Sequence, residues 1–274
     1  MHSVLDLDLD FFVWPIALDI EEDGQRLDPK EYFPNSEKQV RSFLEERCGL
    51  STVHRIPGRF LVHHVDAFTV WREWLEEHIL SNPFNVVHVD AHADLGSGWQ
   101  NESPRFFETE LLKLPVEQRS FPRFGVDAVN SGNYLVAAVA NQWINQLTYV
   151  YPIDPNPPSP AVLRERERME RIQKLHEDGT DGDYPPDLPV YCFQDGDPNT
   201  RKLLLKEYPA LGHSDVKFDT TPIHFEPKVP FSWLEAEMFK YSGFTHMVIA
   251  QSPNYTPNTA DPLLDIISEY VTTA

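Results

Sequence analysis

The segment VVHVDAHADLG carries the residues best suited to chemistry, namely Asp90, His92 and Asp94. Carboxylates and an imidazole that alternate at the end of an apolar strand place several lone-pair donors together, and their repulsion is costly without a cation. The segment therefore predicts a metal site. Residues four apart on an extended strand lie about 13 Å from each other, so the strand must end near His92. Gly96 and Gly98 follow, and we expect them to let the chain turn and return Asp94 to the ion.

A second set of acids lies near the N-terminus, where Asp6, Asp8 and Asp10 alternate with apolar residues. This period of two predicts a strand over residues 3–12 with the three acids on one face. Ligands of an open parallel sheet gather beyond the carboxyl ends of its strands, which favours Asp8 and Asp10 over Asp6 as metal ligands. The alternative is a strand that shows its carboxylates to water.

A third candidate is the segment RFLVHH, which ends in His63 and His64 directly before a helical pattern. At least one of these two imidazoles is therefore expected at the carboxyl end of another strand, where it could ligate a metal. Oxygen-rich coordination with one or two imidazoles favours manganese, with zinc or iron as alternatives. The carboxylates suffice for one divalent ion or for two.

The elements that position these residues alternate between strand and helix. Such alternation predicts an α/β fold, with three layers in the order α/β/α and a mainly parallel sheet. Strands are predicted at 59–63, 86–90, 147–151, 189–193, 222–226 and 245–251, and helices at 37–48, 65–80, 132–146 and 261–271. We expect a single domain over 1–274, with a charged helix inside an insertion at 155–188.

Composition excludes several classes of partner and location. The formal charge of −20, from 23 basic and 43 acidic residues, disfavours nucleic acid and anionic membranes. Two cysteines are too few for a disulfide framework or a cysteine zinc cluster. The acidic start of the chain does not fit a signal peptide, and no apolar run is long enough to span a membrane. These features predict a cytoplasmic protein with a small-molecule substrate.

Two of the motifs resemble those of a known superfamily. DAHAD is similar to the DxHxD signature of the arginase and deacetylase superfamily, and DLDLDFF resembles its DxD strand. The order of the two is reversed here, as a circular permutation would produce. The whole chain, from residue 4 to about 270, more closely resembles the uncharacterised UPF0489 family. The shared segments are VLDLDLDFF, HVDAF with Trp71, HVDAHADL, SGNY and AQSPNYTP.

The superfamily resemblance implies a hydrolase of a carbon–nitrogen bond in an amide, amidine or guanidine. Asp8 and Asp90 would bridge two metals; His64 and Asp94 would complete one site, and Asp10 and His92 the other. A hydroxide activated by the metals would be the nucleophile, because bound divalent ions lower the pKa of water from about 15.7 toward 7. A single ion, as in the deacetylase branch, would need only Asp8, Asp90 and His92.

The groups that would move protons or bind substrate are less defined. No segment matches the superfamily's catalytic histidine or its substrate-binding glutamate, so His63 and His88 are candidates by proximity. His88 is alternatively an outer partner of a ligand or a core histidine. Asn133 at a helix start, and Ser252 and Tyr255 in SPNYTP, are candidates for substrate binding. A helix cap and a proline-fixed turn are the alternatives.

Two other functions remain open from sequence. DLDLDFF also resembles the nucleophile strand of haloacid-dehalogenase-type phosphatases, in which one aspartate attacks and the next moves a proton. That interpretation leaves DAHAD unexplained. The third possibility is a metal-binding interaction module without turnover, in which the ion stabilises the fold.

Overall fold

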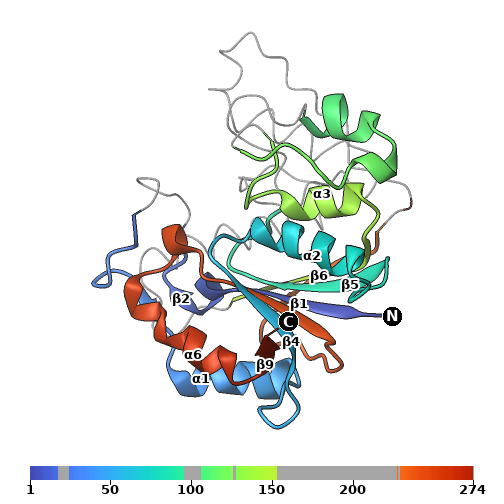
Figure 1. The fold of residues 1–274 in the computed structure, drawn as a ribbon. Helices are drawn as coiled ribbons and strands as arrows, with labels where there is room; N and C mark the ends of the chain where they lie inside the picture. Colours follow the sequence, from blue (N-terminus) through green and yellow to red (C-terminus); the bar gives the residue numbers. More distant parts are fainter. Residues whose placement is uncertain (18–24, 96–105, 126–127, 153–226, 228, 274) are drawn as a thin grey trace, which may run out of the picture.

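The computed structural model describes residues 1–17, 25–95, 106–125, 128–152, 227 and 229–273. Its centre is a seven-stranded sheet with the order β7-β6-β5-β1-β8-β4-β9, and every neighbouring pair is parallel (Figure 1). The strands are β1 (Ser3–Asp8), β4 (Ile56–Leu61), β5 (Phe84–Val89), β6 (Ile144–Tyr151), β7 (Phe231–Glu235), β8 (His246–Ala250) and β9 (Val271–Thr273). This arrangement confirms the predicted parallel sheet, with β1 at its middle.

Helices cover both faces of the sheet, so the predicted three layers are confirmed. α1 (Glu37–Ser42) and α6 (Pro262–Ser268) lie on one face, and α2 (Asp66–Glu76) and α3 (Tyr134–Ala140) on the other (Figure 1). Two short strands, β2 (Val13–Trp14) and β3 (Phe33–Pro34), pair outside the sheet. The remaining turns are 3-10 helices at Leu9–Phe12, Leu111–Lys113, Val116–Gln118, Pro253–Tyr255 and Asn258–Ala260, and π-helices at Phe43–Arg47 and Phe106–Glu110.

The alternation along β1 separates the two cores. Leu5 and Leu7 pack into the core beneath α1 and α6, whereas Val4 packs into the core beneath α2 and α3. The second core contains the fully buried Phe68 and Trp71 of α2. Because side chains alternate between the faces of a strand, the acids of β1 must point toward α2 and α3.

Several strands end earlier than the sequence pattern predicts. β1 stops at Asp8 instead of residue 12, because the Asp8 carboxylate caps a 3-10 turn by accepting a hydrogen bond from Asp10 N at 3.0 Å. Asp10 therefore leaves the strand face on which it was expected. β4 ends at Leu61, which moves His63 and His64 into the loop before α2. β5 ends at Val89, before DAHAD begins.

Other elements differ in kind from the prediction. The sequence pattern missed β7 and β9, and it assigned Val271, the first residue of β9, to the end of the last helix. The segments 155–188, 189–193 and 222–226, together with Gly96 and Gly98, lie outside the described residues. The predicted insertion and the single-domain organisation remain predictions.

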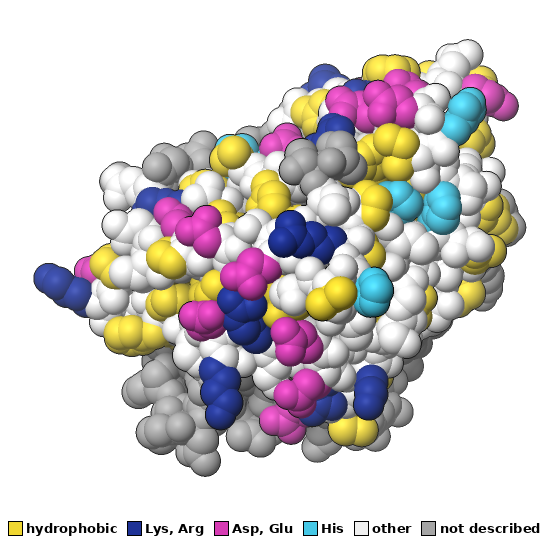
Figure 2. All heavy atoms as spheres, turned by 60° about the horizontal axis from the view of Figure 1, so that its bottom comes forward, with side chains coloured by type: hydrophobic (Ala, Val, Ile, Leu, Met, Phe, Trp, Pro, Cys, Tyr) yellow, Lys and Arg dark blue, Asp and Glu magenta, His cyan; other side chains and the backbone are white. Residues whose placement is uncertain are grey.

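The surface that is turned forward in Figure 2 has a mixed character. Acidic and basic side chains are interspersed over its described part, with apolar side chains scattered between them (Figure 2). Among the described helices, none is both long and apolar enough to cross a membrane.

A matched pair of methionines tests the packing of the central sheet. Met247 on β8 is fully buried, whereas Met238 is 73% exposed. We expect Met247→Ala to lower the free energy of unfolding by about 2–5 kcal/mol, because it leaves a cavity between closely packed neighbours. Met238→Ala should change it by less than about 0.5 kcal/mol. Urea denaturation measures both, and equal effects would contradict the placement of β8 inside the sheet.

Candidate metal centre

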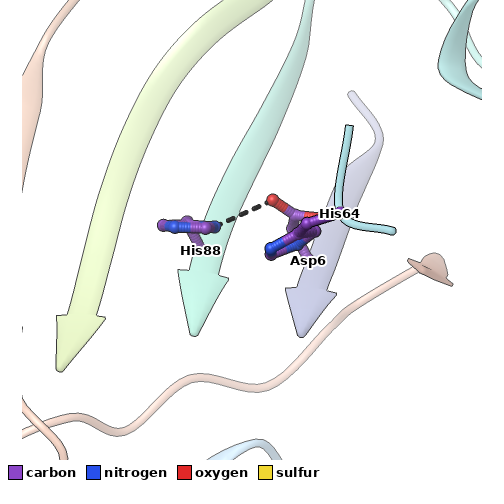
Figure 3. A group of neighbouring side chains, drawn as sticks. All are labelled: Asp6, His64 and His88. Atoms are coloured by element: carbon purple, nitrogen blue, oxygen red, sulfur yellow. Dashed lines mark hydrogen bonds and ion pairs between the residues drawn. The ribbon is translucent and has the colours of Figure 1, made fainter. Parts of the chain in front are cut away.

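The acids of β1 reach different depths, and Asp6 is the deepest. Its carboxylate is fully buried between two imidazoles, with Oδ1 3.1 Å from His64 Nε2 and Oδ2 2.9 Å from His88 Nδ1 (Figure 3). His88 projects from the neighbouring strand β5, and His64 from the loop after β4. Asp6 thus connects two of the predicted histidines below the carboxyl edge of the sheet.

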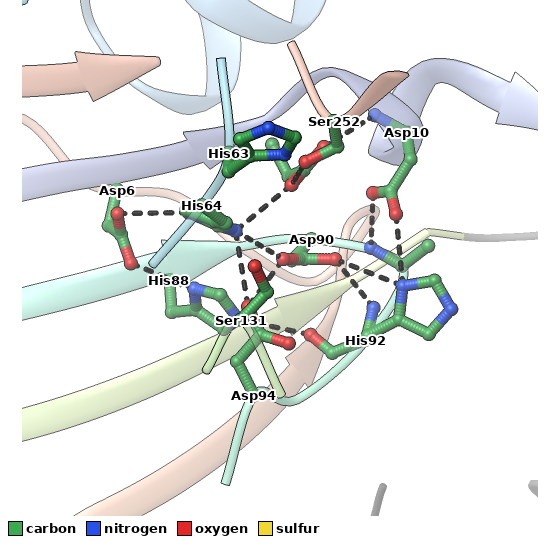
Figure 4. Close-up of polar contacts among 12 residues, drawn as sticks. Asp6, Asp10, His63, His64, His88, Asp90, His92, Asp94, Ser131 and Ser252 are labelled. Carbon is green, nitrogen blue, oxygen red and sulfur yellow. Dashed lines mark hydrogen bonds and ion pairs between the residues drawn. The ribbon is translucent and has the colours of Figure 1, made fainter. Parts of the chain in front are cut away.

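Above this layer, four adjacent strands bring their carboxyl ends together. Asp8 ends β1. Asp90 follows β5, and Ser252 lies two residues beyond the end of β8 (Figure 4). His64 enters from the loop after β4. Since β5, β1, β8 and β4 are consecutive in the sheet, segments distant in sequence supply one group of polar side chains. Such edges are where open α/β sheets bind ligands.

Three of the predicted ligands surround a nitrogen of a fourth, His64. His64 Nδ1 lies 3.0 Å from Asp8 Oδ2, 2.9 Å from Asp90 Oδ2 and 3.2 Å from Asp94 Oδ2. All four side chains are buried. We call Asp8, His64, Asp90 and Asp94 the first donor group. Buried carboxylates of this density are stable only when paired or bound to a cation.

The hydrogen bonds of His64 show that this group fits a metal ion. Nδ1 is buried and has no hydrogen-bond partner, although three carboxylate oxygens lie close to it. Nε2, on the other side of the ring, contacts Asp6. An imidazole with one nitrogen bonded to a carboxylate and the other directed at carboxylate oxygens is the arrangement typical of a metal-ligating histidine.

A second set of ligands adjoins the first. Asp10 Oδ2 lies 2.9 Å and Asp90 Oδ1 3.5 Å from His92 Nδ1. We call Asp10, Asp90 and His92 the second donor group. Donor atoms from these residues lie within 4.8 Å of one another, as do those of Asp8, His64 and Asp90. Asp90 is therefore common to both groups, with Oδ2 toward His64 and Oδ1 toward His92.

The contacts of the second group also fix its orientation. His92 Nε2 lies 2.8 Å from the carbonyl oxygen of Ala17, which can only accept, so Nε2 donates and Nδ1 faces the acids. Asp10 Oδ1 accepts a hydrogen bond from Ala91 N at 3.2 Å. Asp8 contributes Oδ2 to the first group, while its Oδ1 accepts from Asp10 N. A bridging role for Asp8 remains a prediction.

The pKa values of carboxylates in the two groups shift in different directions. Burial and the charge of Asp90 raise the pKa of Asp94 to about 7. Burial and the charges of Asp8 and Asp90 raise the pKa of Asp10 well above its usual range. Burial alone would also raise the pKa of Asp90, but the adjacent imidazoles of His64 and His92 keep it well below that range. The imidazoles thus stabilise one central carboxylate, and its neighbours lack comparable compensation without a cation.

The turn that returns Asp94 to the site is made by residues of DAHAD itself. Asp90 Oδ1 accepts a hydrogen bond from His92 N at 2.6 Å, which closes a side-chain turn. Asp94 itself adopts the left-handed conformation, with φ of 49°. Aspartate tolerates this conformation better than most residues, so the turn occurs between residues 90 and 94.

The candidates for proton transfer differ in access. His88 is fully buried, and its Nε2 lies 3.0 Å from the carbonyl oxygen of His92 while Nδ1 contacts Asp6. Although His88 Nε2 is also 3.4 Å from Asp90 Oδ2, its bond to a carbonyl makes it a donor and not a ligand. His63 is exposed in the loop that carries His64. Access therefore favours His63 over His88 for exchange with a substrate.

The candidates for substrate binding also lie in different surroundings. Ser252 is buried, has φ of 45°, and donates a short hydrogen bond from Oγ to Asp8 Oδ2. The Tyr255 ring lies 4.8 Å from that of His92, between centroids. Both therefore adjoin a donor group. The amide of Asn133 is buried and bonded to Asn130 N and the Ala128 carbonyl, so its contacts give no support to a substrate-binding role.

Sequence reasoning missed Tyr134, whose hydroxyl donates to Asp6 Oδ2 at 2.5 Å. It is fully buried at the start of α3. The motif SGNY contains this residue, but nothing local in it indicates a partner 128 residues away. This contact gives Asp6 a structural role, although the sequence pattern favoured Asp8 and Asp10 over it as metal ligands.

Comparison with known proteins adds no family assignment. No family model matches the chain, and no curated protein matches it. The resemblance to the UPF0489 family and to arginase-like domains therefore remains a prediction. The fold and the buried cluster of aspartates and histidines stand on the structure alone.

The two donor groups predict two metal-binding steps of different strength. The first group offers four buried donors and should bind Mn²⁺ more tightly than the second, whose His92 side chain is 12% exposed. Asp90→Asn alters both groups and should lower the Mn²⁺ affinity of both steps. The loss should exceed about 10–100-fold, the typical effect of removing an outer partner of a ligand. Asp10→Asn should weaken only the second step. Isothermal titration calorimetry with Mn²⁺ measures these effects.

Asp265→Asn provides the matched control, because Asp265 is exposed on α6 and belongs to neither group. It should bind Mn²⁺ as the wild type does. A wild-type protein without Mn²⁺ affinity, or with affinity that Asp90→Asn leaves unchanged, would contradict the metal centre.

Proposed function

We propose that the chain is a metal-dependent hydrolase of a carbon–nitrogen bond in a small amide, amidine or guanidine. The observation that carries the proposal is the division of the Asp90 carboxylate between two donor groups, with its oxygens 2.9 Å from His64 Nδ1 and 3.5 Å from His92 Nδ1. A carboxylate shared by two adjacent ion sites is an arrangement used by two-metal hydrolases. The resemblance of DAHAD and DLDLDFF to arginase-like motifs supports the choice of bond.

The residues have separate tasks in this proposal. The first and second donor groups hold one cation each, and manganese is the proposed metal. A divalent cation, when bound, polarises a substrate oxygen or nitrogen and lowers the pKa of water toward 7. Ser252 holds Asp8 in place through its hydroxyl, and the ring of Tyr255 lies beside His92. These two residues border the position proposed for the substrate.

Hydrolysis of a carbon–nitrogen bond also needs a proton for the leaving nitrogen. His63 is proposed for this transfer, because it is exposed and lies next to His64 in the chain. His88 has both ring nitrogens bonded within the protein and is less suited to it. The assignment thus separates the exposed imidazole from the buried one.

The proposal is tested by assaying hydrolysis of amides, amidines and guanidines with Mn²⁺, with phosphate esters in parallel. We expect turnover of a carbon–nitrogen substrate that dialysis against a chelator removes and added Mn²⁺ restores. Asp90→Asn should lower kcat/KM at least about 100-fold, the scale of losing one transition-state stabiliser, and Asp265→Asn should not.

Other outcomes identify the competing functions. Phosphatase activity that Asp8→Asn abolishes and Asp90→Asn leaves intact would replace the proposal with an aspartate-nucleophile phosphatase. Tight Mn²⁺ binding without turnover of any of these substrates would instead indicate a metal-binding module.

His63→Gln tests the proton transfer separately. We expect kcat to fall about 100-fold or more, with Mn²⁺ affinity unchanged, because His63 belongs to neither donor group. The control is His54→Gln, which alters another exposed imidazole. Activity of His63→Gln equal to that of the control would assign the proton transfer to a different residue.

A further inference from the structure

The carboxylate of Asp6 lies below the donor groups, and its contacts are with buried side chains. Asp6 Oδ1 contacts His64 Nε2, and Asp6 Oδ2 contacts both His88 Nδ1 and the Tyr134 hydroxyl (Figure 3). None of these residues has more than 1% of its surface exposed. Asp6 therefore meets neither solvent nor substrate, and its function must act through its neighbours.

The contact with His64 determines which nitrogen faces the donor group. Asp6 Oδ2 accepts a hydrogen bond from the Tyr134 hydroxyl, and each oxygen of Asp6 faces an imidazole nitrogen, which are the surroundings of an ionised carboxylate. An ionised carboxylate only accepts, so His64 Nε2 must donate to Asp6. In the neutral imidazole this leaves the lone pair on Nδ1, which lies among Asp8, Asp90 and Asp94.

The other two contacts tie Asp6 to the framework of the fold. Tyr134 stands at the start of α3, and its ring lies 5.8 Å from that of Trp71 on α2, between centroids. His88 joins Asp6 to the carbonyl oxygen of His92 at 3.0 Å. One carboxylate therefore links the packed helices, the loop that carries His64 and the DAHAD turn.

We propose that Asp6 is a positioning residue of the metal centre, held by Tyr134, which orients His64 so that Nδ1 ligates the first cation. This inference rests on the metal centre of the proposed function and not on the bond that it hydrolyses. A histidine that ligates a metal through one nitrogen and donates to a carboxylate through the other is held in both tautomer and orientation.

The position of Asp6 distinguishes this role from direct ligation. Donor atoms of Asp6, His64 and His88 do lie within 4.8 Å of one another. However, three protein groups already contact the two oxygens of Asp6, and the nitrogen of His64 without a partner is the one on the opposite side of the ring. Asp6 thus stabilises His64 through Nε2, the ring nitrogen that faces away from the donor group.

The test compares Asp6→Asn and Tyr134→Phe with wild type in Mn²⁺ titration. We expect Asp6→Asn to weaken the first binding step about 10–100-fold, the usual effect of losing an outer partner. Tyr134→Phe keeps the ring and removes one hydroxyl, so it should weaken that step by a smaller factor. Tyr270→Phe is the matched control, because the buried Tyr270 donates to Glu45 at the α1–α6 side and should leave Mn²⁺ affinity unchanged.

A spectroscopic measurement separates positioning from a general loss of stability. In protein with ¹⁵N-labelled histidine and bound Zn²⁺ as a diamagnetic probe, His64 should carry its proton on Nε2. In Asp6→Asn that resonance should shift or broaden as the ring loses its fixed partner, while Tyr270→Phe should keep the wild-type spectrum. If Asp6→Asn does not fold, Tyr134→Phe carries both measurements.

The outcomes keep this inference apart from the proposed function. Wild-type Mn²⁺ affinity and an unchanged His64 resonance in both Asp6→Asn and Tyr134→Phe would overturn the positioning role, even in an active hydrolase. Loss of a separate, additional Mn²⁺ ion in Asp6→Asn, with the first step intact, would also overturn it. Weakened binding in these variants supports the inference even if the wild type hydrolyses none of the substrates.

Discussion

Repulsion among carboxylates in one buried cluster is the constraint on which the rest of the site depends. Two like charges 4 Å apart cost about 4 kcal/mol at an effective dielectric constant of 20, and Asp8, Asp10 and Asp94 all surround Asp90. The imidazoles compensate Asp90, as its lowered pKa indicates, but the raised pKa values of Asp10 and Asp94 show that they do not compensate the whole group. A cation shared through Asp90 satisfies this constraint with the donors that are present.

The parallel sheet makes such crowding possible. On β1, the period of two directs Leu5 and Leu7 into one core and the acids toward α2 and α3, so apolar burial on both faces holds the strand in place. The acids then emerge where four neighbouring strands end. The stability of the sheet comes from its cores, and the cost of grouped charges is confined to one edge.

Sequence could predict what depends on local pattern. The alternation of polar and apolar residues identified the parallel sheet, and the residue types of DLDLD, HH and DAHAD identified side chains that the structure brings together. It could not predict where strands end, because this depends on individual side-chain hydrogen bonds. A cap at Asp8 moves Asp10 off the strand. A side-chain turn at Asp90, together with the left-handed conformation of Asp94, brings Asp94 back to the site. Tyr134 was missed for a different reason, since its contact with Asp6 arises only after α3 packs on the sheet.

The histidines of the two donor groups have different hydrogen-bond partners on the ring nitrogen that faces away from the carboxylates. This difference fits separate roles for the two groups in the proposed function. His64 of the first group is supported by Asp6, which is itself bonded to a tyrosine of the packed core. His92 of the second group is supported by the carbonyl oxygen of Ala17, and its own side chain is partly exposed. A ligand held by buried, fully bonded partners loses little freedom on binding an ion, whereas one at the surface can adjust to what binds beside it. In the proposed function, the first group would therefore hold the more tightly bound cation, and the second would face the substrate.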